Sequence, residues 1–300
     1  MDYIDNLCEN YKNINEPIEL DIIIEGGLFN GLYTAGSLFL IKKLEKKNYL
    51  RVNRISGASV GAILGFYYFC DLLDDFPKDF ITIREYFKKD LNLNNIDSIA
   101  EDRTKSITKN KINQLNKRLF ISYVKNGEQI VKNIFKDNNE LKESILKSIQ
   151  IPYFTTNSFY RKYGNNNYLD GGVPFIFNER EYTKNKCILY LNNSNIKTMF
   201  TIKNEENAHS RILEGALDAH NFFLHKKNGS ICSYIHDWSL QDFMILRLKQ
   251  LLYKFLMFVC WIIHNNKEYI IPILKKTYFI KDLKSIFNEM FKDFVILKCL

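Results

Sequence analysis

The stretch "GASVG" places Ser59 between Gly57 and Gly61, directly before an apolar run. G-x-S-x-G is the pattern of a strained turn between a strand and a helix, which exposes the serine Oγ as a nucleophile. The flanking glycines let neighbouring backbone approach where a Cβ would collide. The first amide of the following helix favours negative charge on a reacting carbonyl oxygen. The pattern is typical of acyl transfer to serine, and its structural alternative is a plain glycine-flanked turn.

A second glycine-rich turn, "EGGLFNG", follows the first apolar run and ends at Gly31. A phosphate-binding P-loop needs Lys and then Ser or Thr after its last glycine, whereas Leu32 and Tyr33 stand there. A dinucleotide fingerprint needs a glycine where Leu28 stands. With both excluded, the turn offers backbone N–H groups at the start of a helix, where they are suited to stabilise an oxyanion.

The motif "YLDGG" supplies a carboxylate, Asp170, followed by Gly171 and Gly172. If an apolar strand ends at Asp170, its side chain lies at the carboxyl edge of the sheet, where α/β active sites gather. There it can serve as a general base for a serine. An Asp-Gly turn between strands is the structural alternative.

Histidine is the other residue type that activates serine, and the order Ser, Asp, His is open because all five histidines follow Asp170. They stand within helical patterns, which favours structural or exposed roles. We therefore expect a Ser–Asp dyad, with a Ser–His–Asp triad as the alternative. The histidines are His209, His220, His225, His236 and His264.

These motifs need elements to position them, and the hydrophobic pattern predicts a β-α-β-α unit at the start of the chain. Residues 18–24 and 50–56 form short, nearly continuous apolar runs, typical of strands covered on both faces. Residues 32–48 carry apolar positions at helical spacing, and the run from 59 to 73 is apolar almost all round. The unit indicates an α/β sheet.

Residues 74–150 are rich in Lys and Asn and predict a helical insertion or cap over the sheet, with helices at 80–91, 111–126 and 139–150. We expect strands to resume after this insertion, and the C-terminal third to be helical. The expected strands are 151–157, 166–172 and 186–193, and the expected helices are 206–227, 239–264 and 270–292.

Composition narrows the class of protein. Hydrophobic residues make up 46% of the chain, which favours a globular protein. The six cysteines form no CxxC pair, so we expect neither a metal site nor a disulfide framework. The net charge of +8 forms no long cluster, so we expect no nucleic-acid partner. The N-terminus lacks the pattern of a signal peptide, and we expect an intracellular location, cytoplasmic or peripheral to a membrane.

The glycine-rich turn, the G-x-S-x-G elbow and the D-G-G motif, in this order, resemble the patatin-like phospholipases. "GGLFNGLYTAGSLFLIKKLE", "SGASVGAI", "ESILKSIQIPYF" and "YLDGG" carry the resemblance, which covers about residues 18–195. It implies a three-layer α/β/α fold, in which 18–195 is the catalytic domain and 196–300 a helical region packing on it or on a membrane. Asn30 stands where the family usually has a basic residue, and Leu28 where it usually has glycine.

The resemblance implies a serine lipid acyl hydrolase, phospholipase A-like, that forms an acyl-enzyme. Ser59 would be its nucleophile and Asp170 its general base, and backbone amides near Gly26, Gly27 and Leu28 its oxyanion hole. No metal or organic cofactor is implied, and the substrate would be a phospholipid or another acyl lipid. The alternatives are a catalytically inactive membrane-binding or interaction protein on this fold, and a Ser–His–Asp esterase.

Membrane contact is expected at the most apolar part of the tail, residues 251–263. This run contains Lys254 and is short of the ~20 residues that cross a bilayer. Its aromatic residues and lysines suit an interfacial helix, with a buried helix as the structural alternative.

Overall fold

The computed structural model describes residues 2–11, 17–90, 92–178, 186–193, 207–225, 229–266 and 268. The chain divides into two units, one of residues 1–200 and 204–238 and the other of residues 201–203 and 239–300. The first contains the whole described sheet, and the second contains the helix α10 (Leu240–Asn265).

A mixed sheet forms the centre of the first unit, in the strand order β5-β6-β3-β2-β1-β7-β8, with β4 paired to β3. Its middle is parallel, because β1 pairs in parallel with both β2 and β7, and β2 with β3. The strands are β1 (Ile18–Ile24), β2 (Leu50–Ala58), β3 (Leu119–Lys125), β4 (Glu128–Lys132), β5 (Arg161–Tyr163), β6 (Asn166–Asp170), β7 (Lys186–Leu191) and β8 (Cys232–Tyr234).

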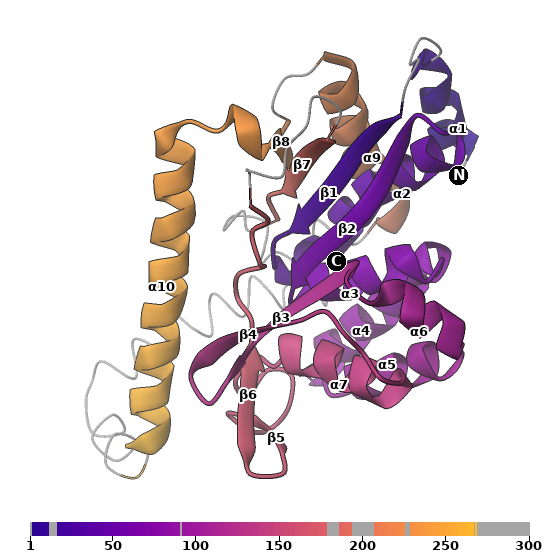
Figure 1. The fold of residues 1–300 in the computed structure, drawn as a ribbon. Coiled ribbons are helices and arrows are strands. Elements are labelled where there is room, and N and C mark those ends of the chain that lie inside the picture. The colour runs from indigo at the N-terminus through magenta and orange to yellow at the C-terminus, as the bar shows by residue number, and fades with distance from the viewer. Residues whose placement is uncertain are drawn as a thin grey trace. The chain divides into compact units, whose positions relative to one another are not determined.

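Helices flank this sheet in a three-layer α/β/α arrangement, which confirms the predicted fold class (Figure 1). The helices of the first unit are α1 (Asp2–Leu7), α2 (Gly31–Lys46), α3 (Val60–Phe69), α4 (Phe76–Asp90), α5 (Ile96–Lys105), α6 (Lys109–Leu115), α7 (Asn138–Ser148) and α9 (Ala208–His225). Short 3-10 turns are η1 (Cys8–Tyr11), η2 (Leu28–Asn30), η3 (Leu73–Asp75) and η6 (Ile235–Asp237).

The predicted β-α-β-α unit is confirmed as β1, α2, β2 and α3. In β1, every residue from Leu20 to Ile24 is buried, as expected of a strand covered on both faces. Its neighbour β2 runs parallel to it, with Ile22 opposite Ile55. Both strands therefore deliver their carboxyl ends, and the two glycine-rich turns that follow, to the same edge of the sheet.

Two expected elements are wrong. The predicted helix over 111–126 ends at Leu115, and β3 follows it, pairing with β2 through Ile55 and Leu119. Residues 119–123 are mostly buried, so contact with the sheet outweighs the helical spacing of the apolar residues. The predicted strand over 151–157 is instead a run of turns, in which the Thr155 hydroxyl donates to the Ile149 carbonyl. The helix expected at 270–292 lies outside the described residues.

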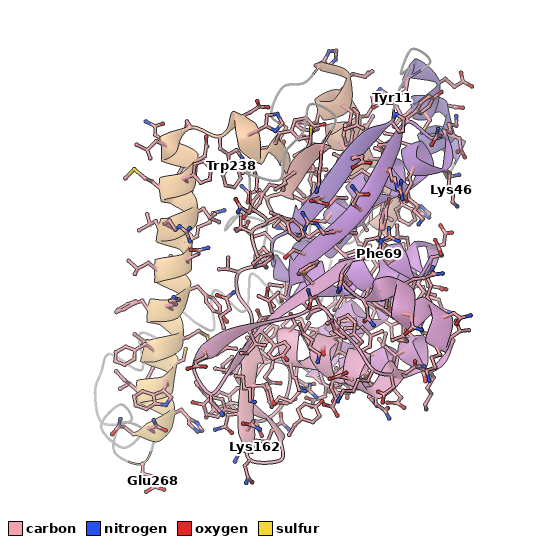
Figure 2. All side chains as sticks on the ribbon, in the orientation of Figure 1. Tyr11, Lys46, Phe69, Lys162, Trp238 and Glu268 are labelled. Carbon is pink, nitrogen blue, oxygen red and sulfur yellow. The ribbon has the colours of Figure 1, made fainter. Side chains whose placement is uncertain are left out.

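The first unit ends at Trp238, which packs against the sheet and is labelled in Figure 2. Its ring lies 4.8 Å, between centroids, from that of Tyr190 in β7, and its indole N–H donates to the Ser233 hydroxyl at 3.0 Å. The next residue, Ser239, caps α10 in a reciprocal capping box with Asp242. The described helices, α10 included, fall short of the combined length and apolarity that crossing a bilayer requires.

Candidate active site

Ser59 is the single residue between the end of β2 and the start of α3. Its backbone has φ 56° and ψ −131°, a conformation that costs energy in any residue with a Cβ. Gly57 and Gly61 permit this turn, because a Cβ on Gly57 would meet the Gly61 backbone and one on Gly61 would meet the Ile24 carbonyl. The two glycines thus bring α3 against β1 and β2, with the serine half-buried at the top of the turn.

A second serine supports this strained backbone. The Ser59 N–H donates to the Ser148 hydroxyl at 3.0 Å, and that hydroxyl donates to the Ser122 carbonyl at 2.7 Å. Ser148 is fully buried at the end of α7, and Ser122 is fully buried in β3. Sequence reasoning missed Ser148, because it is an ordinary serine in an amphipathic helix and only the fold brings it to the elbow.

Asp170 is the last residue of β6, where it pairs with Tyr123 of β3. Its N–H donates to the Gln150 carbonyl at 2.8 Å, and its Oδ1 accepts from the Gly172 N–H at 2.6 Å. Gly172 has φ +62°, a conformation that glycine adopts without strain and that turns this amide back toward the carboxylate.

The structure brings Ser59 and Asp170 together. Burial, with only 5% of Asp170 exposed, raises the pKa of its carboxyl to about 6. The hydrogen bond from the Gly172 N–H and the nearby Ser59 hydroxyl oppose this rise, since both favour the ionised form. A carboxylate with this pKa accepts a proton more readily than an exposed aspartate does.

The glycine-rich turn after β1 lies against Ser59. A Cβ built on Gly26 would lie 3.1 Å from the Cβ of Ser59, and Gly27 leads from it into η2. The turn is anchored by Asn30, whose Nδ2 donates to the Asn193 carbonyl at 2.9 Å. The Gly26 backbone thus lies beside Ser59, which is where the predicted oxyanion site would need its donors.

A positive charge lies next to this turn, although Asn30 itself is neutral. The Arg211 guanidinium, from α9, donates to the Asn30 Oδ1 at 3.4 Å and stacks over the ring of Tyr33. Sequence reasoning missed this arginine, because nothing in the helical pattern around it indicates a contact with a turn so distant in the sequence.

Gly31 and Gly171, also predicted as turn glycines, lie where an added Cβ would collide with a neighbouring residue. Gly31 begins α2 against the ring of Phe80, and Gly171 lies against the Ser122 backbone. Both contacts join the edge of the sheet that carries Ser59 to neighbouring elements.

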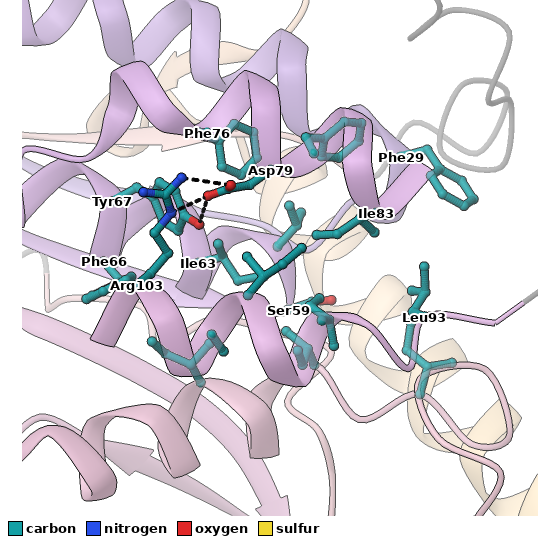
Figure 3. Close-up of a pocket in the computed structure, with 18 residues that line it drawn as sticks. Phe29, Ser59, Ile63, Phe66, Tyr67, Phe76, Asp79, Ile83, Leu93 and Arg103 are labelled. Carbon is teal, nitrogen blue, oxygen red and sulfur yellow. Dashed lines mark hydrogen bonds and ion pairs between the residues drawn. The ribbon is translucent and has the colours of Figure 1, made fainter. Parts of the chain in front are cut away.

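Ser59 also lines a pocket whose walls are almost entirely apolar (Figure 3). Side chains of α3, α4, α5 and α7 surround it, including Ile63, Ile83 and Ile145. Such an apolar pocket beside Ser59 suits a hydrocarbon chain rather than a polar substrate.

The described contacts place two of the five histidines in structural settings. His220 is buried, with its Nδ1 3.1 Å from the Tyr11 hydroxyl. His236 stacks on Tyr234 and faces Asp237. Within the described ranges, no three His, Cys, Asp or Glu side chains come together as metal ligands would.

Comparison with known proteins adds to this geometry. A family model described as patatin-like phospholipase matches residues 22–178, just over half of the chain. No curated protein and no solved structure matched the chain. The matched segment begins in β1 and includes the glycine-rich turn, the elbow at Ser59 and the D-G-G motif. The chain therefore belongs to the patatin-like phospholipases, a family of lipid acyl hydrolases.

Proposed function

We propose that the chain is a phospholipase A-like serine acyl hydrolase in which Ser59 is the nucleophile and Asp170 the general base. The observation that carries the proposal is that the Ser59 hydroxyl lies close enough to the buried Asp170 carboxylate to influence its pKa, which burial raises to about 6. At neutral pH this carboxylate is ionised, so it can take the hydroxyl proton. Family membership supports the same chemistry on lipid esters.

In the first half-reaction, Ser59 Oγ attacks the ester carbonyl carbon as its proton passes to the Asp170 carboxylate. The developing oxyanion is stabilised by backbone N–H groups near Gly26, Gly27 and Leu28 and by the N-terminus of α3. The tetrahedral intermediate then expels the alcohol of the ester, which takes the proton from Asp170. An acyl-enzyme on Ser59 remains.

In the second half-reaction, Asp170 takes a proton from a water molecule, and the resulting hydroxide attacks the acyl-enzyme. The intermediate collapses, Ser59 leaves with the proton returned by Asp170, and the fatty acid is released. The sum is one ester and one water giving one alcohol and one acid, so no cofactor is needed.

We further propose that residues 251–263 contact the lipid–water interface, with catalysis confined to residues 18–195 and membrane contact to 196–300. In α10 these residues present large apolar side chains to solvent, Phe255 being 59% exposed. An exposed helix bearing aromatic and aliphatic side chains lowers its free energy by entering the headgroup boundary. The exposed apolar residues of this segment are Leu251, Leu252, Phe255, Leu256, Phe258, Trp261, Ile262 and Ile263.

The test combines fluorophosphonate labelling with fatty-acid release from phospholipid vesicles. The wild type is expected to be labelled and to release fatty acid, Ser59→Ala to do neither, and Asp170→Asn to lose most turnover while staying folded. Ser56→Ala is the matched control, because Ser56 is a buried serine of β2, the strand that leads into the elbow, and its hydroxyl has no hydrogen-bond partner in the described structure.

Two outcomes would contradict the proposal. Folded wild type that is neither labelled nor active would favour the catalytically inactive alternative. Near-normal turnover in Asp170→Asn would show that another group is the base.

A further inference from the structure

The pocket beside Ser59 runs along one face of α3. Ser59, Ile63 and Tyr67 all line it, and a spacing of four residues keeps them on the same side of the helix. An α-helix rises about 1.5 Å per residue, so the pocket extends roughly 12 Å from the nucleophile to Tyr67. Figure 3 shows Ile63 between Ser59 and the Tyr67 end.

The walls of this pocket come from the region inserted between β2 and β3 and from α7. Ile83 of α4, Ala100 of α5 and Ile149 after α7 line it and belong to or pack on one apolar cluster. The cavity volume is about 70 Å³, so a hydrocarbon chain enters only as isoleucines such as Ile83 and Ile149 change rotamer. They are aliphatic and make no hydrogen bonds that such a change would break.

The far end of the pocket is different, because it is closed by a charged cluster. Asp79 of α4 accepts from the Tyr67 hydroxyl at 2.7 Å and from Arg103 of α5 through Nε at 2.6 Å and Nη2 at 2.8 Å. Arg103 also pairs with Asp75 at 3.1 Å. Figure 3 shows the ion pair apart from Ser59, with apolar side chains between them.

This cluster is a stable end to the pocket. The Asp79 side chain is only 13% exposed, and both of its oxygens accept hydrogen bonds from the guanidinium. An alkyl chain that pushed further would have to separate a buried, bidentate ion pair and leave a carboxylate without its partner. The aliphatic side chains along the pocket can change rotamer to admit a chain, whereas the ion pair at its end cannot separate without a large cost.

We propose that the Tyr67–Asp79–Arg103 cluster terminates the acyl site and makes medium-chain acyl groups the preferred substrates. This rests on the proposed function, with the ester carbonyl at Ser59 and the acyl tail pointing toward Tyr67. Carbon–carbon bonds of about 1.5 Å advance an extended chain by about 1.3 Å each, so roughly 12 Å accommodates about eight to ten carbons. Acyl chains of membrane-lipid length meet the cluster and fit less well, so their hydrolysis is slower but not abolished.

The first test is the chain-length profile of kcat/KM on p-nitrophenyl butyrate, octanoate, decanoate and palmitate. The wild type is expected to prefer octanoate and decanoate and to act at least about tenfold less well on palmitate, since a pocket discriminates strongly against groups that it must exclude. Equal rates on decanoate and palmitate would overturn the inference and leave the proposed function standing.

Two variants test the cluster itself. Combining Asp79→Leu with Arg103→Met removes both charges of the ion pair at once. This double variant is expected to raise the ratio of kcat/KM on palmitate to that on butyrate about tenfold. Ala100→Leu narrows the pocket one helical turn before Arg103 and is expected to move the preference toward butyrate, without touching the charges. A wild-type profile in either folded variant overturns the inference.

The matched control is Asp97→Asn, because Asp97 of α5 forms a bidentate pair with Arg161 at 2.7 and 2.8 Å but does not line the pocket. It is expected to keep the wild-type profile. If the wild type cleaves no ester, the proposed function fails, and calorimetry with decanoate and palmitate then tests the length limit alone. Tighter binding of decanoate, lost in the double variant, supports the limit, and equal binding overturns it.

Discussion

The hydroxyl of Ser148 accepts a hydrogen bond from the Ser59 backbone N–H at 3.0 Å and thereby supports the strained backbone of the proposed nucleophile. Its own proton goes to the Ser122 carbonyl at 2.7 Å, so one hydroxyl joins β3, α7 and the elbow. The φ of 56° at Ser59 is thus stabilised by a contact between residues 89 positions apart in the sequence.

Ser148→Ala is expected to weaken the elbow, because it leaves the Ser59 N–H without its acceptor. A lost partner of this kind costs about 1–3 kcal/mol in the free energy of unfolding. We expect fluorophosphonate labelling of Ser59 to slow about tenfold, since roughly 1.4 kcal/mol of misplacement corresponds to that factor. Labelling rates and urea unfolding measure the two effects.

Ser144→Ala is the matched control for this substitution. Ser144 is also buried in α7, but its hydroxyl donates to the Glu140 carbonyl at 2.7 Å, within the helix. Its labelling rate should equal that of the wild type. If instead Ser148→Ala is labelled as fast as the wild type, the elbow keeps its conformation without the Ser148 hydroxyl.

Activity is expected to fall as pH drops through about 6, because burial raises the pKa of Asp170 to about 6 and only its ionised form accepts the serine proton. The kcat/KM profile on a soluble ester should rise to a plateau above that pH. Substituting each of the five histidines singly is the control, since a histidine base would titrate in the same range. A loss of about a thousandfold in one of these variants would contradict the dyad and favour a triad.

Asp170→Asn is expected to unfold at higher temperature than the wild type above pH 6. The folded-state pKa of Asp170, about 6, exceeds the ordinary value of 3.8, so the wild type loses stability as pH rises between these two values. The loss is complete above the folded pKa and corresponds to at most about 3 kcal/mol. Calorimetry across pH should show the advantage of the variant vanishing below pH 4, and an advantage that persists there would contradict this cause.

Replacing Phe255 and Phe258 together by serine is expected to weaken binding to anionic phospholipid vesicles about tenfold, because two exposed aromatic side chains no longer leave water for the lipid. Hydrolysis of a soluble ester should not change. Met244→Ser with Ile245→Ser is the control, since both are exposed apolar residues of α10 outside the segment 251–263. Vesicle flotation measures the binding, and equal losses in the two double variants would refute the special role of 251–263.

The amino-acid sequence by itself determined the elements that carry the site. Buried runs in β1 and β2, and glycines at 57 and 61, specify strands and a turn through local sterics, so the elbow at Ser59 was predictable. The helical spacing of apolar residues in 111–126 predicted a helix that does not form over its second half. Leu119 and its neighbours pair with β2 instead, because packing in the sheet outweighs their local helical preference. The D-G-G motif likewise located Asp170 at the end of a strand.

Only the tertiary structure decided how these groups are tuned. The pKa of Asp170 depends on burial, which comes from residues far away in sequence. The support from Ser148, the arginine beside Asn30 and the charged end formed by Asp79 and Arg103 are all contacts between different elements. Periodicity and turn chemistry report only on neighbours within a few residues, and no local pattern specifies which distant side chains will meet.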